Sequence, residues 1–212
     1  MNKIIDRITL TLLVLSCSLL VACTPAELFD YRIHGATMGT SYNVTLVFPQ
    51  KVGALKIDSI QGAIQRSLNS VDNAMSTYKA KSELSKINNL PVDTPYKLSS
   101  EIQTVLAYAK KLYVKTDGLF DITVGPLIDL WGFGAQDPVF EAPEQNALDK
   151  VALNIGSNNF TIEDGVITKK SLVKIDLSAI AKGYAVDQVA KVLDALFIKN
   201  YLIEVGGEIS AK

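Results

Sequence analysis

Histidine and cysteine are scarce in this sequence, and their scarcity excludes several kinds of site. Among the 212 residues there is one histidine, His34, and there are two cysteines, Cys17 and Cys23. A single histidine excludes a catalytic histidine pair, a multi-histidine metal site and a zinc finger from this chain. Two cysteines cannot form a disulfide framework. The formal net charge of −1 leaves no strongly basic surface that would neutralise nucleic-acid phosphates.

Apolar residues, in contrast, are abundant. Hydrophobic residues make up 48% of the chain and charged residues 20%. This balance is typical of a chain with a buried core and excludes a disordered polymer. The length suits one large domain or two small ones. Much of the positive mean hydropathy, +0.21, comes from the first 23 residues.

The N-terminal segment has the pattern of an export signal. Lys3 and Arg7 precede an apolar run over residues 8–22, which has about the length of a signal peptide. A membrane-spanning helix needs a longer run, roughly 20 apolar residues. The run ends in Leu20-Val21-Ala22-Cys23. This ending resembles a bacterial lipobox, in which small residues precede a cysteine that is lipidated and becomes the first mature residue.

The lipobox predicts how the chain is divided and where it is located. We expect a signal peptide over residues 1–22, a lipidated Cys23, a lipid-anchored tether over residues 23–30 and one domain over residues 31–212. The protein would be extracytoplasmic and lipid-anchored to a bacterial membrane, on the periplasmic side of the inner membrane. The alternative is an ordinary signal or membrane anchor in which Cys23 is incidental.

Hydrophobic periodicity predicts both helices and strands in the domain. Apolar residues three or four apart indicate helices over residues 55–75, 82–89, 99–113 and 179–197, the third capped by Ser99 or Ser100. Alternation indicates strands over residues 42–48, 160–162, 166–168, 172–176 and 201–205. Asp164-Gly165 is a strong hairpin signal between two of them. Because the elements follow no regular βαβ order, we expect an α+β fold, a mixed sheet with packed helices.

The C-terminal end of the sequence predicts one more strand. Ile209 begins it, and no later segment closes it. Since a compact domain rarely stops one strand short of its sheet, we expect the domain to be truncated at the C-terminus, as the first part of a longer gene product.

Three segments combine glycine or polar residues with aromatic ones. Residues 34–40 carry Gly35 and Gly39, which would let backbone amides approach a ligand. Residues 75–88 place Tyr78 between two helices, where its ring could stack on a flat group. Residues 118–134 set aromatic side chains beside glycines, which suits a pocket for a planar ligand. Each segment also has a purely structural alternative. Residues 34–40 could be a simple turn, residues 75–88 a capped connection between helices, and the aromatic residues of 118–134 part of the core.

A fourth segment, residues 174–184, carries a sharper signal. Asp176 ends a predicted strand, and the first helical turn follows at once. The free amides of such a turn favour anionic phosphate, and Lys182 adds positive charge. The glycine spacing fits neither a Walker A loop nor a dinucleotide-binding G-x-G-x-x-G motif. The residues alone indicate an anion or nucleotide site, or else a capping aspartate beside a solvent-facing lysine.

Taken in order, these segments resemble the ApbE family, the FAD:protein FMN transferases. The resemblance covers the chain from about Tyr31. The matching motifs are Thr37-Met38-Gly39-Thr40, Met75-Ser76-Thr77-Tyr78 with Ser82-Glu83-Leu84-Ser85, Gly118-Leu119-Phe120-Asp121-Ile122-Thr123-Val124-Gly125-Pro126-Leu127, Asp176-Leu177-Ser178-Ala179-Ile180-Ala181-Lys182-Gly183-Tyr184-Ala185 and Gly206-Gly207-Glu208. Many family members are periplasmic lipoproteins, which agrees with the lipobox. The fold implied is ApbE-like, or T-fold-like.

The resemblance implies an activity and a set of site residues. The family moves FMN from FAD, its substrate, to a threonine of an acceptor flavoprotein and releases AMP, with Mg²⁺ at the diphosphate. Acceptors include subunits of ion-translocating redox complexes. By position, the residues that would contact FAD are Met38, Tyr78, Leu119, Phe120, Asp121, Asp176 and Lys182. Ala179 would offer its main-chain carbonyl oxygen to Mg²⁺, which binds hard oxygen ligands.

The family pattern also contains parts that residues 1–212 do not supply. A His-x-x-Asp-Pro-x-Thr-Gly-like segment and a later segment with aspartate and threonine metal ligands would follow Lys212. The resemblance therefore implies a flavin site without a full metal site, and it assigns no catalytic residue within this chain. A FAD pyrophosphatase, with water as the acceptor, and a non-catalytic FAD-binding lipoprotein or inactive fragment are the alternative functions.

Overall fold

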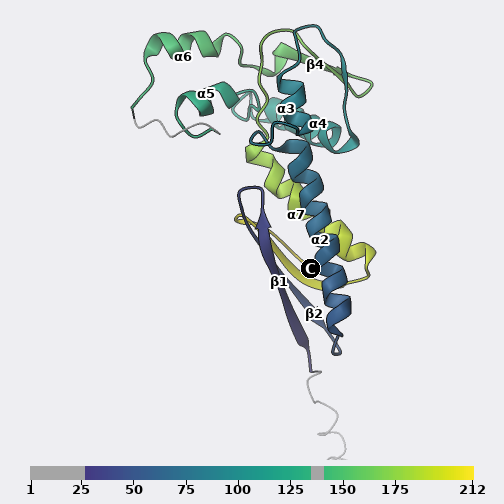
Figure 1. Ribbon diagram of the computed structural model, residues 1–212. Helices are drawn as coiled ribbons and strands as arrows, with labels where there is room; N and C mark the ends of the chain where they lie inside the picture. Colours follow the sequence, from purple (N-terminus) through teal and green to yellow (C-terminus); the bar gives the residue numbers. More distant parts are fainter. Residues whose placement is uncertain (1–26, 135–140) are drawn as a thin grey trace, which may run out of the picture.

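The computed structural model describes residues 27–134 and 141–212, and it has the expected α+β architecture. A four-stranded antiparallel sheet and a smaller three-stranded antiparallel sheet are joined by helices (Figure 1). In spatial order the larger sheet consists of β1 (Phe29–Thr37), β2 (Thr40–Phe48), β6 (Asn200–Val205) and β7 (Glu208–Ala211). The smaller sheet consists of β3 (Tyr96–Lys97), β5 (Val166–Lys169) and β4 (Phe160–Glu163).

Six α-helices and one 3₁₀ turn complete the described part of the chain. They are α2 (Ala54–Met75), α3 (Glu83–Asn88), α4 (Ser100–Lys115), α5 (Gly125–Leu130), α6 (Gln145–Ala152), η1 (Ser157–Asn159) and α7 (Ser178–Ala195). None of the helices within residues 27–134 and 141–212 is long and apolar enough to cross a membrane. The predicted signal peptide and Cys23 lie outside the described residues.

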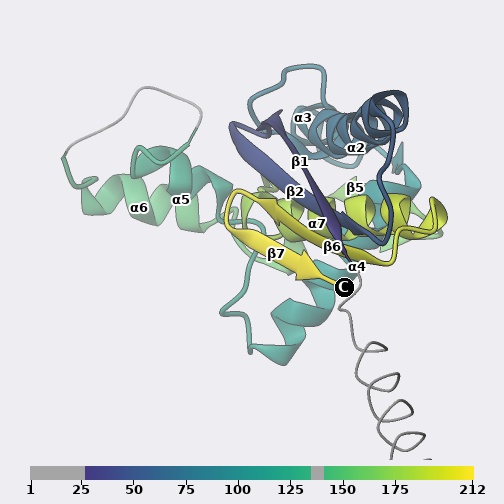
Figure 2. The ribbon, with the colours of Figure 1, turned by 90° about the horizontal axis from the view of Figure 1, so that it is seen from below.

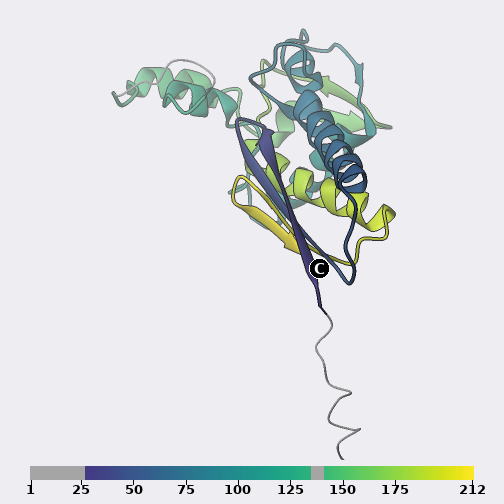
Figure 3. The same cartoon turned by 60° about the horizontal axis from the view of Figure 1, so that its bottom comes forward.

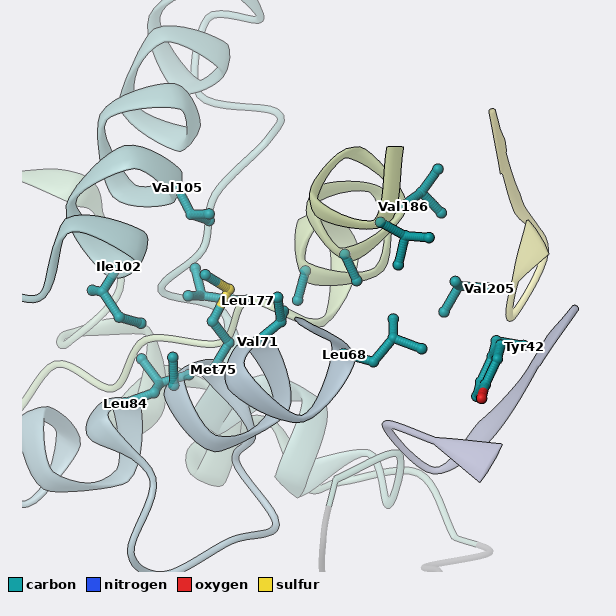
Figure 4. Close-up of a cluster of buried hydrophobic side chains, with 14 of the residues drawn as sticks. Tyr42, Leu68, Val71, Met75, Leu84, Ile102, Val105, Leu177, Val186 and Val205 are labelled. Atoms are coloured by element: carbon teal, nitrogen blue, oxygen red, sulfur yellow. The ribbon is translucent and has the colours of Figure 1, made fainter. Parts of the chain in front are cut away.

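The larger sheet buries one face under α2 and α7. Alternate residues of its two central strands point inward and are buried, among them Tyr42 of β2 and Val205 of β6. They meet Leu68 of α2 and Val186 of α7, which lie on the same side of the strands (Figure 4). The buried Tyr42 hydroxyl donates to Gln65 Oε1 of α2 at 3.0 Å. Apolar residues that recur every second position on the strands and about every 3.6 positions on the helices thus form the core.

The long helix α2 links this sheet to the rest of the molecule. One end lies along β1, and the other reaches α3 and α4 beside the smaller sheet (Figures 1 and 3). There Met75 packs among Leu84, Ile102 and Leu177, so the core continues from one end of α2 to the other. The pair α5 and α6 projects away from the sheet as a lateral arm (Figure 2).

The structure confirms most of the predicted elements. The four predicted helices correspond to α2, α3, α4 and α7. Ser99 is the cap of α4, since its side chain accepts a hydrogen bond from the Ile102 amide. Asp164 and Gly165 have φ angles of 49° and 72° in the β4–β5 turn, as a hairpin with an Asp-Gly turn requires. Ile209 lies in β7, which pairs with β6.

The prediction of a strand over residues 172–176 is wrong. This segment joins no ladder. The Asn88 side chain bonds both the amide and the carbonyl of Ile175, and the Asp176 amide donates to Ile122 O at 2.7 Å. A side chain and a loop thus satisfy backbone groups that a neighbouring strand would otherwise pair.

Other differences concern elements that carry little sequence signal. Residues 34–37, expected as part of a turn, belong to β1, which begins at Phe29 within the expected tether. Both α5 and α6 were absent from the predicted elements. Proline at the start of α5 explains why a helix begins in a glycine-rich segment, because its fixed φ suits the first turn. Leu196, an apolar residue within the helix predicted over residues 179–197, is exposed just after α7.

Candidate functional site

Three connections between elements converge on one cavity of about 550 Å³. They are the β1–β2 turn, the segment that follows α2, and the first turns of α7. The lining residues are Met38, Gly39, Asp72, Met75, Ser76, Thr77, Tyr78, Lys79, Ser178, Ala181 and Lys182. The cavity therefore draws on the first, second and fourth of the segments singled out in the sequence.

The β1–β2 turn brings Met38 to this cavity. Thr37 and Thr40 form the last pair of the hairpin, and Met38 and Gly39 make the turn with φ angles of 49° and 73°. Two left-handed residues give the backbone twist that matches paired strands, and glycine adopts this conformation without a steric penalty. The Met38 side chain is half-buried against the core, which presents an apolar, polarizable surface to the cavity.

Serine side chains hold the loop that carries Tyr78. Ser76 Oγ accepts hydrogen bonds from the amides of Tyr78 and Lys79, at 3.2 and 3.3 Å. Ser82 Oγ donates to Ser76 O at 2.6 Å and accepts from the Ser85 amide at 2.9 Å, so it caps α3 and ties the loop down. Tyr78 nevertheless remains 69% exposed. The backbone of the loop around Tyr78 is thus held in place, while the ring is exposed and available to a ligand.

The charges at the cavity favour an anion. Lys79 is paired with Asp72 and also donates to Asn73 Oδ1. Within residues 27–134 and 141–212, no carboxylate oxygen lies within 4.0 Å of Lys182 Nζ. Lys182 lies in the first turns of α7, where the helix macrodipole adds partial positive charge. An unneutralised cation and a helix N-terminus at one place form an electrostatic setting for phosphate.

A second cavity, of about 370 Å³, adjoins the first at Thr77, Tyr78 and Ser178. Asp176 lines it, and its Oδ1 accepts a hydrogen bond from the Ser178 amide at 2.7 Å, which fixes the carboxylate at the start of α7. Phe133 lines it as well. The two cavities together suit an elongated ligand that carries an aromatic group and an anionic centre.

A divalent-cation site is not built by the described residues alone. Across residues 27–134 and 141–212, no group of three or more histidine, cysteine, aspartate or glutamate side chains could hold a metal ion. Magnesium prefers near-octahedral coordination by several oxygens. The residues that fit a nucleotide ligand therefore do not by themselves fit a complete Mg²⁺ site.

The convergence of these motifs is characteristic of one protein family, whose model matches residues 38–212. The chain belongs to the ApbE family. It is 39% identical over 199 residues to the FAD:protein FMN transferase of Vibrio cholerae, covering 93% of this chain and 58% of that relative. To the FAD:protein FMN transferase of Haemophilus influenzae it is 38% identical over 218 residues, covering 100% of this chain and 62% of the relative.

Solved ApbE structures share the fold. The flavin transferase ApbE from Vibrio cholerae superimposes with a TM-score of 0.83 at 37% identity, covering 88% of this chain and 60% of that one. The apo form of the Pseudomonas stutzeri flavinyl transferase ApbE gives a TM-score of 0.80 at 29% identity, and the match covers 89% of this chain and 62% of that one. The chain spans about three fifths of the length of these ApbE proteins.

The ApbE fold brings four of the predicted site residues together. Met38, Tyr78 and Lys182 line the larger cavity, and Asp176 lines the smaller one beside Tyr78. Ala179, the predicted metal ligand, lies one residue from Ser178 but lines a third cavity, between α4, α7 and β7.

The predicted stretch Leu119, Phe120 and Asp121 lines neither of the two adjoining cavities. The Leu119 side chain is 91% exposed, and Phe120 packs partly against the core. Asp121 Oδ1 accepts from the amide and the hydroxyl of Thr123, at 2.8 and 2.6 Å. Thr123 Oγ1 in turn accepts from the Gly156 amide at 2.7 Å. Asp121, predicted to contact FAD, thus orders the base of the lateral arm through Thr123.

Sequence reasoning did not assign several residues of this ApbE site. Ser76 and Lys79 lie in a segment that was singled out, but only Tyr78 was chosen from it. Phe133 likewise belongs to the glycine and aromatic segment. The sequence gives no indication of a role for Asn88, because the residue that it contacts, Ile175, lies far away in the sequence.

Proposed function

We propose that this chain forms the FAD-binding part of a FAD:protein FMN transferase, which moves FMN from FAD to a threonine of an acceptor protein and releases AMP. The observation that carries the proposal is the convergence of the exposed Tyr78 ring, Lys182 and the α7 N-terminus on two adjoining cavities. The ApbE relatives that are named FAD:protein FMN transferases support the general reaction, transfer of FMN from FAD to a protein.

In this proposal each residue has a role that its surroundings favour. Tyr78 offers an uncovered ring for stacking on one of the aromatic groups of FAD. Lys182 and the positive end of the α7 dipole bind the diphosphate. Met38 supplies an apolar wall, and Asp176 a fixed hydrogen-bond acceptor. The chain thus binds and orients FAD so that its phosphoanhydride bond faces an acceptor.

The overall reaction replaces the phosphoanhydride bond of FAD by a phosphoester bond to threonine. The threonine oxygen bonds to the phosphorus of the FMN half and gives up its proton to water, the phosphoanhydride bond breaks, and the AMP half leaves with the bridging oxygen. Catalysis of such transfers depends mainly on positioning and on stabilising charge. Lys182 would contribute to both, because its ammonium is not neutralised by a nearby carboxylate of the described residues.

The proposal includes Mg²⁺, as the family resemblance implies. A divalent ion at the diphosphate would neutralise charge on the transferring group. In this chain the Ala179 main-chain carbonyl is the proposed ligand, and the diphosphate and water would supply others. Since the described residues build no complete cation site, the ion would need protein ligands besides Ala179.

We also propose that Cys23 carries a lipid and that the domain acts outside the cytoplasm, on acceptors such as subunits of ion-translocating redox complexes. Support comes from the charged and apolar leader with its lipobox-like ending. The tether would then lead from the membrane to β1, which begins at Phe29.

Flavin transfer to a purified acceptor tests the proposal. The full-length gene product is incubated with FAD, Mg²⁺ and an acceptor domain that carries the target threonine, and flavin fluorescence is read in a denaturing gel. We expect a fluorescent acceptor band and one AMP released per acceptor, and no band when the threonine is replaced by valine. Release of AMP and free FMN without a band would instead assign a FAD pyrophosphatase. A full-length protein that neither binds nor cleaves FAD would overturn the proposal.

A further inference from the structure

A buried lysine lies behind the site and is not accounted for by the flavin contacts. Lys169, the last residue of β5, is only 2% exposed. In the described part of the chain no carboxylate oxygen lies within 4.0 Å of its ammonium. A buried charge without a counter-ion is costly, so it needs strong hydrogen-bond partners. Packing alone would be satisfied by an apolar residue of similar length.

The partner of Lys169 is the main chain at the end of α3. Its Nζ donates to Asn88 O at 2.8 Å. Asn88 is the last residue of that helix, where the unpaired carbonyl groups carry partial negative charge. The ammonium therefore fixes the position of Asn88 through a charge-assisted hydrogen bond.

Asn88 in turn holds the segment that precedes α7. Its Nδ2 donates to Ile175 O at 2.8 Å, and its Oδ1 accepts from the Ile175 amide at 2.8 Å. This two-point contact occupies both backbone groups of Ile175, as a neighbouring strand would. The next residue is Asp176, whose carboxylate accepts from the Ser178 amide at the start of α7.

One continuous set of hydrogen bonds thus runs from Lys169 to the cavity. Asn88 and Asp176 both line the smaller cavity, and Ser178 lines both cavities. Lys169 itself lines neither of them. A shift of Asn88 would be transmitted to Asp176 and to the first amides of α7.

We propose that Lys169 is a positioning residue of the flavin site, which acts through Asn88 to hold Asp176 and the α7 N-terminus in place for FAD. The link to FAD rests on the proposed function, whereas the positioning of residues 174–178 does not. Lys169 touches no ligand in this arrangement. Its effect is on where other groups are held, a property that hydrogen exchange measures directly.

Amide hydrogen exchange in the full chain, without FAD, is the first measurement. Lys169→Met removes the ammonium at similar length, and Asn88→Ala removes the side-chain contact to Ile175 but keeps the carbonyl. The matched control is Lys170→Met, because Lys170 is the exposed neighbour. We expect both K169M and N88A to speed exchange over residues 174–178 by about tenfold, as expected for the loss of one strong hydrogen bond, while β2 residues 42–46 stay protected.

Exchange over residues 174–178 that is unchanged in K169M would overturn the proposal, even if the variant melts at a lower temperature. If K169M fails to fold, Lys169→Gln, which is shorter and cannot reach Asn88 O, takes its place. In the double variant of Lys169 and Asn88 we expect exchange no faster than in N88A alone. Additive effects would show that Lys169 does not act through Asn88, and would also overturn the proposal.

FAD titration below the melting temperature of each variant is the second measurement. We expect K169M to bind FAD about tenfold more weakly than the wild type, and K170M to bind equally well. If the wild type binds FAD and K169M binds it with the same affinity, the proposed link to the flavin site is wrong. If the wild type itself does not bind FAD, the proposed function fails, while the exchange result still decides the positioning role.

Discussion

Gly206 and Lys182 are in direct contact: a Cβ atom built on Gly206 would lie 3.0 Å from Lys182 Cδ. The same Cβ would lie 2.8 Å from Thr40 Cγ2, and Gly206 has a φ angle of +54°. The β6–β7 turn therefore packs closely against the aliphatic stem of Lys182, a residue that lines the larger cavity. Only glycine allows the turn to approach so closely.

Replacing this glycine by alanine should displace Lys182. In Gly206→Ala the added methyl group must push aside Thr40 or the lysine stem, and we expect FAD to bind several-fold more weakly. Gly207→Ala is the matched control, since Gly207 also has a positive φ, +97°, but its Cβ would meet no atom within 4 Å. Both variants should lose about 1 kcal/mol of stability through backbone strain. Calorimetric titration with FAD, beside thermal melts, separates the two effects. Equal FAD affinity in G206A and G207A would contradict this role of the turn.

Tyr78 gives a direct test of the aromatic contact. Because its ring is exposed and fixed only through the backbone, truncation should remove a ligand contact and little stability. We expect Tyr78→Ala to weaken FAD binding by about 1–3 kcal/mol, roughly tenfold to a hundredfold. Tyr78→Phe keeps the ring and should bind nearly as the wild type does. Unchanged affinity of Y78A in fluorescence titration would remove Tyr78 from the site.

Ser82 should couple helix stability to the site. Ser82→Ala loses the α3 cap and the bond to Ser76 O, so we expect a loss of about 1–2 kcal/mol in urea unfolding together with weaker FAD binding. Ser99→Ala is the control, because the Ser99 side chain caps α4 and its hydroxyl bonds the Ile102 amide, whereas the Tyr78 loop is held by Ser76 and Ser82. It should lose stability alone. A loss of FAD affinity in S99A as large as that in S82A would show that the effect is not local.

Local patterns predicted the elements of this fold better than they predicted its site. Helix α2 and the β4–β5 hairpin follow from the apolar spacing of one and the Asp-Gly turn of the other, because both signals lie within a few residues. Residues 172–176 do not join a sheet, because the Asn88 side chain bonds the backbone of Ile175 instead. No local sequence pattern predicts this contact, since the two residues are far apart in the chain.

The site residues show the same division. The order of the motifs selected Met38, Tyr78, Asp176 and Lys182. In the structure these four residues line two adjoining cavities. The motifs could not show that Asp121 is engaged by Thr123, since that contact depends on the fold of the turn before α5. Lys169 reads as an ordinary lysine at the end of a strand, and only its burial reveals its role.

Cys23 provides a test of location. If the lipobox-like ending is processed, the mature protein should start at Cys23, carry lipid on it and partition into the membrane fraction. We expect Cys23→Ser to release the protein or leave it unprocessed, whereas Cys17→Ser, within the apolar run, should change neither property. Intact-mass analysis measures both. A wild-type protein that retains Met1 and the leader would contradict lipidation.

Lys169 should also give the protein a specific pH dependence of stability. Burial lowers the pKa of its ammonium below the ordinary 10.5, and the nearby charge of Lys174 lowers that pKa further. Between the lowered pKa of the folded state and the ordinary pKa of the unfolded state, the unfolded chain binds more protons, so stability rises with pH. Below the lowered pKa the full cost of burying the charge is present, and it is relieved as the pH rises toward 10.5.

The difference in unfolding free energy between wild type and K169M isolates this contribution, because the other titrating groups are common to both proteins. We expect the difference to change in favour of the wild type as the pH rises from neutral toward 10.5, with each pH point measured by urea unfolding. Lys174→Met should move this change to higher pH, since removing a neighbouring positive charge raises the pKa of Lys169. A difference that does not vary with pH would mean that the pKa of Lys169 is the same in the folded and unfolded states, so that burial of its ammonium carries no net penalty.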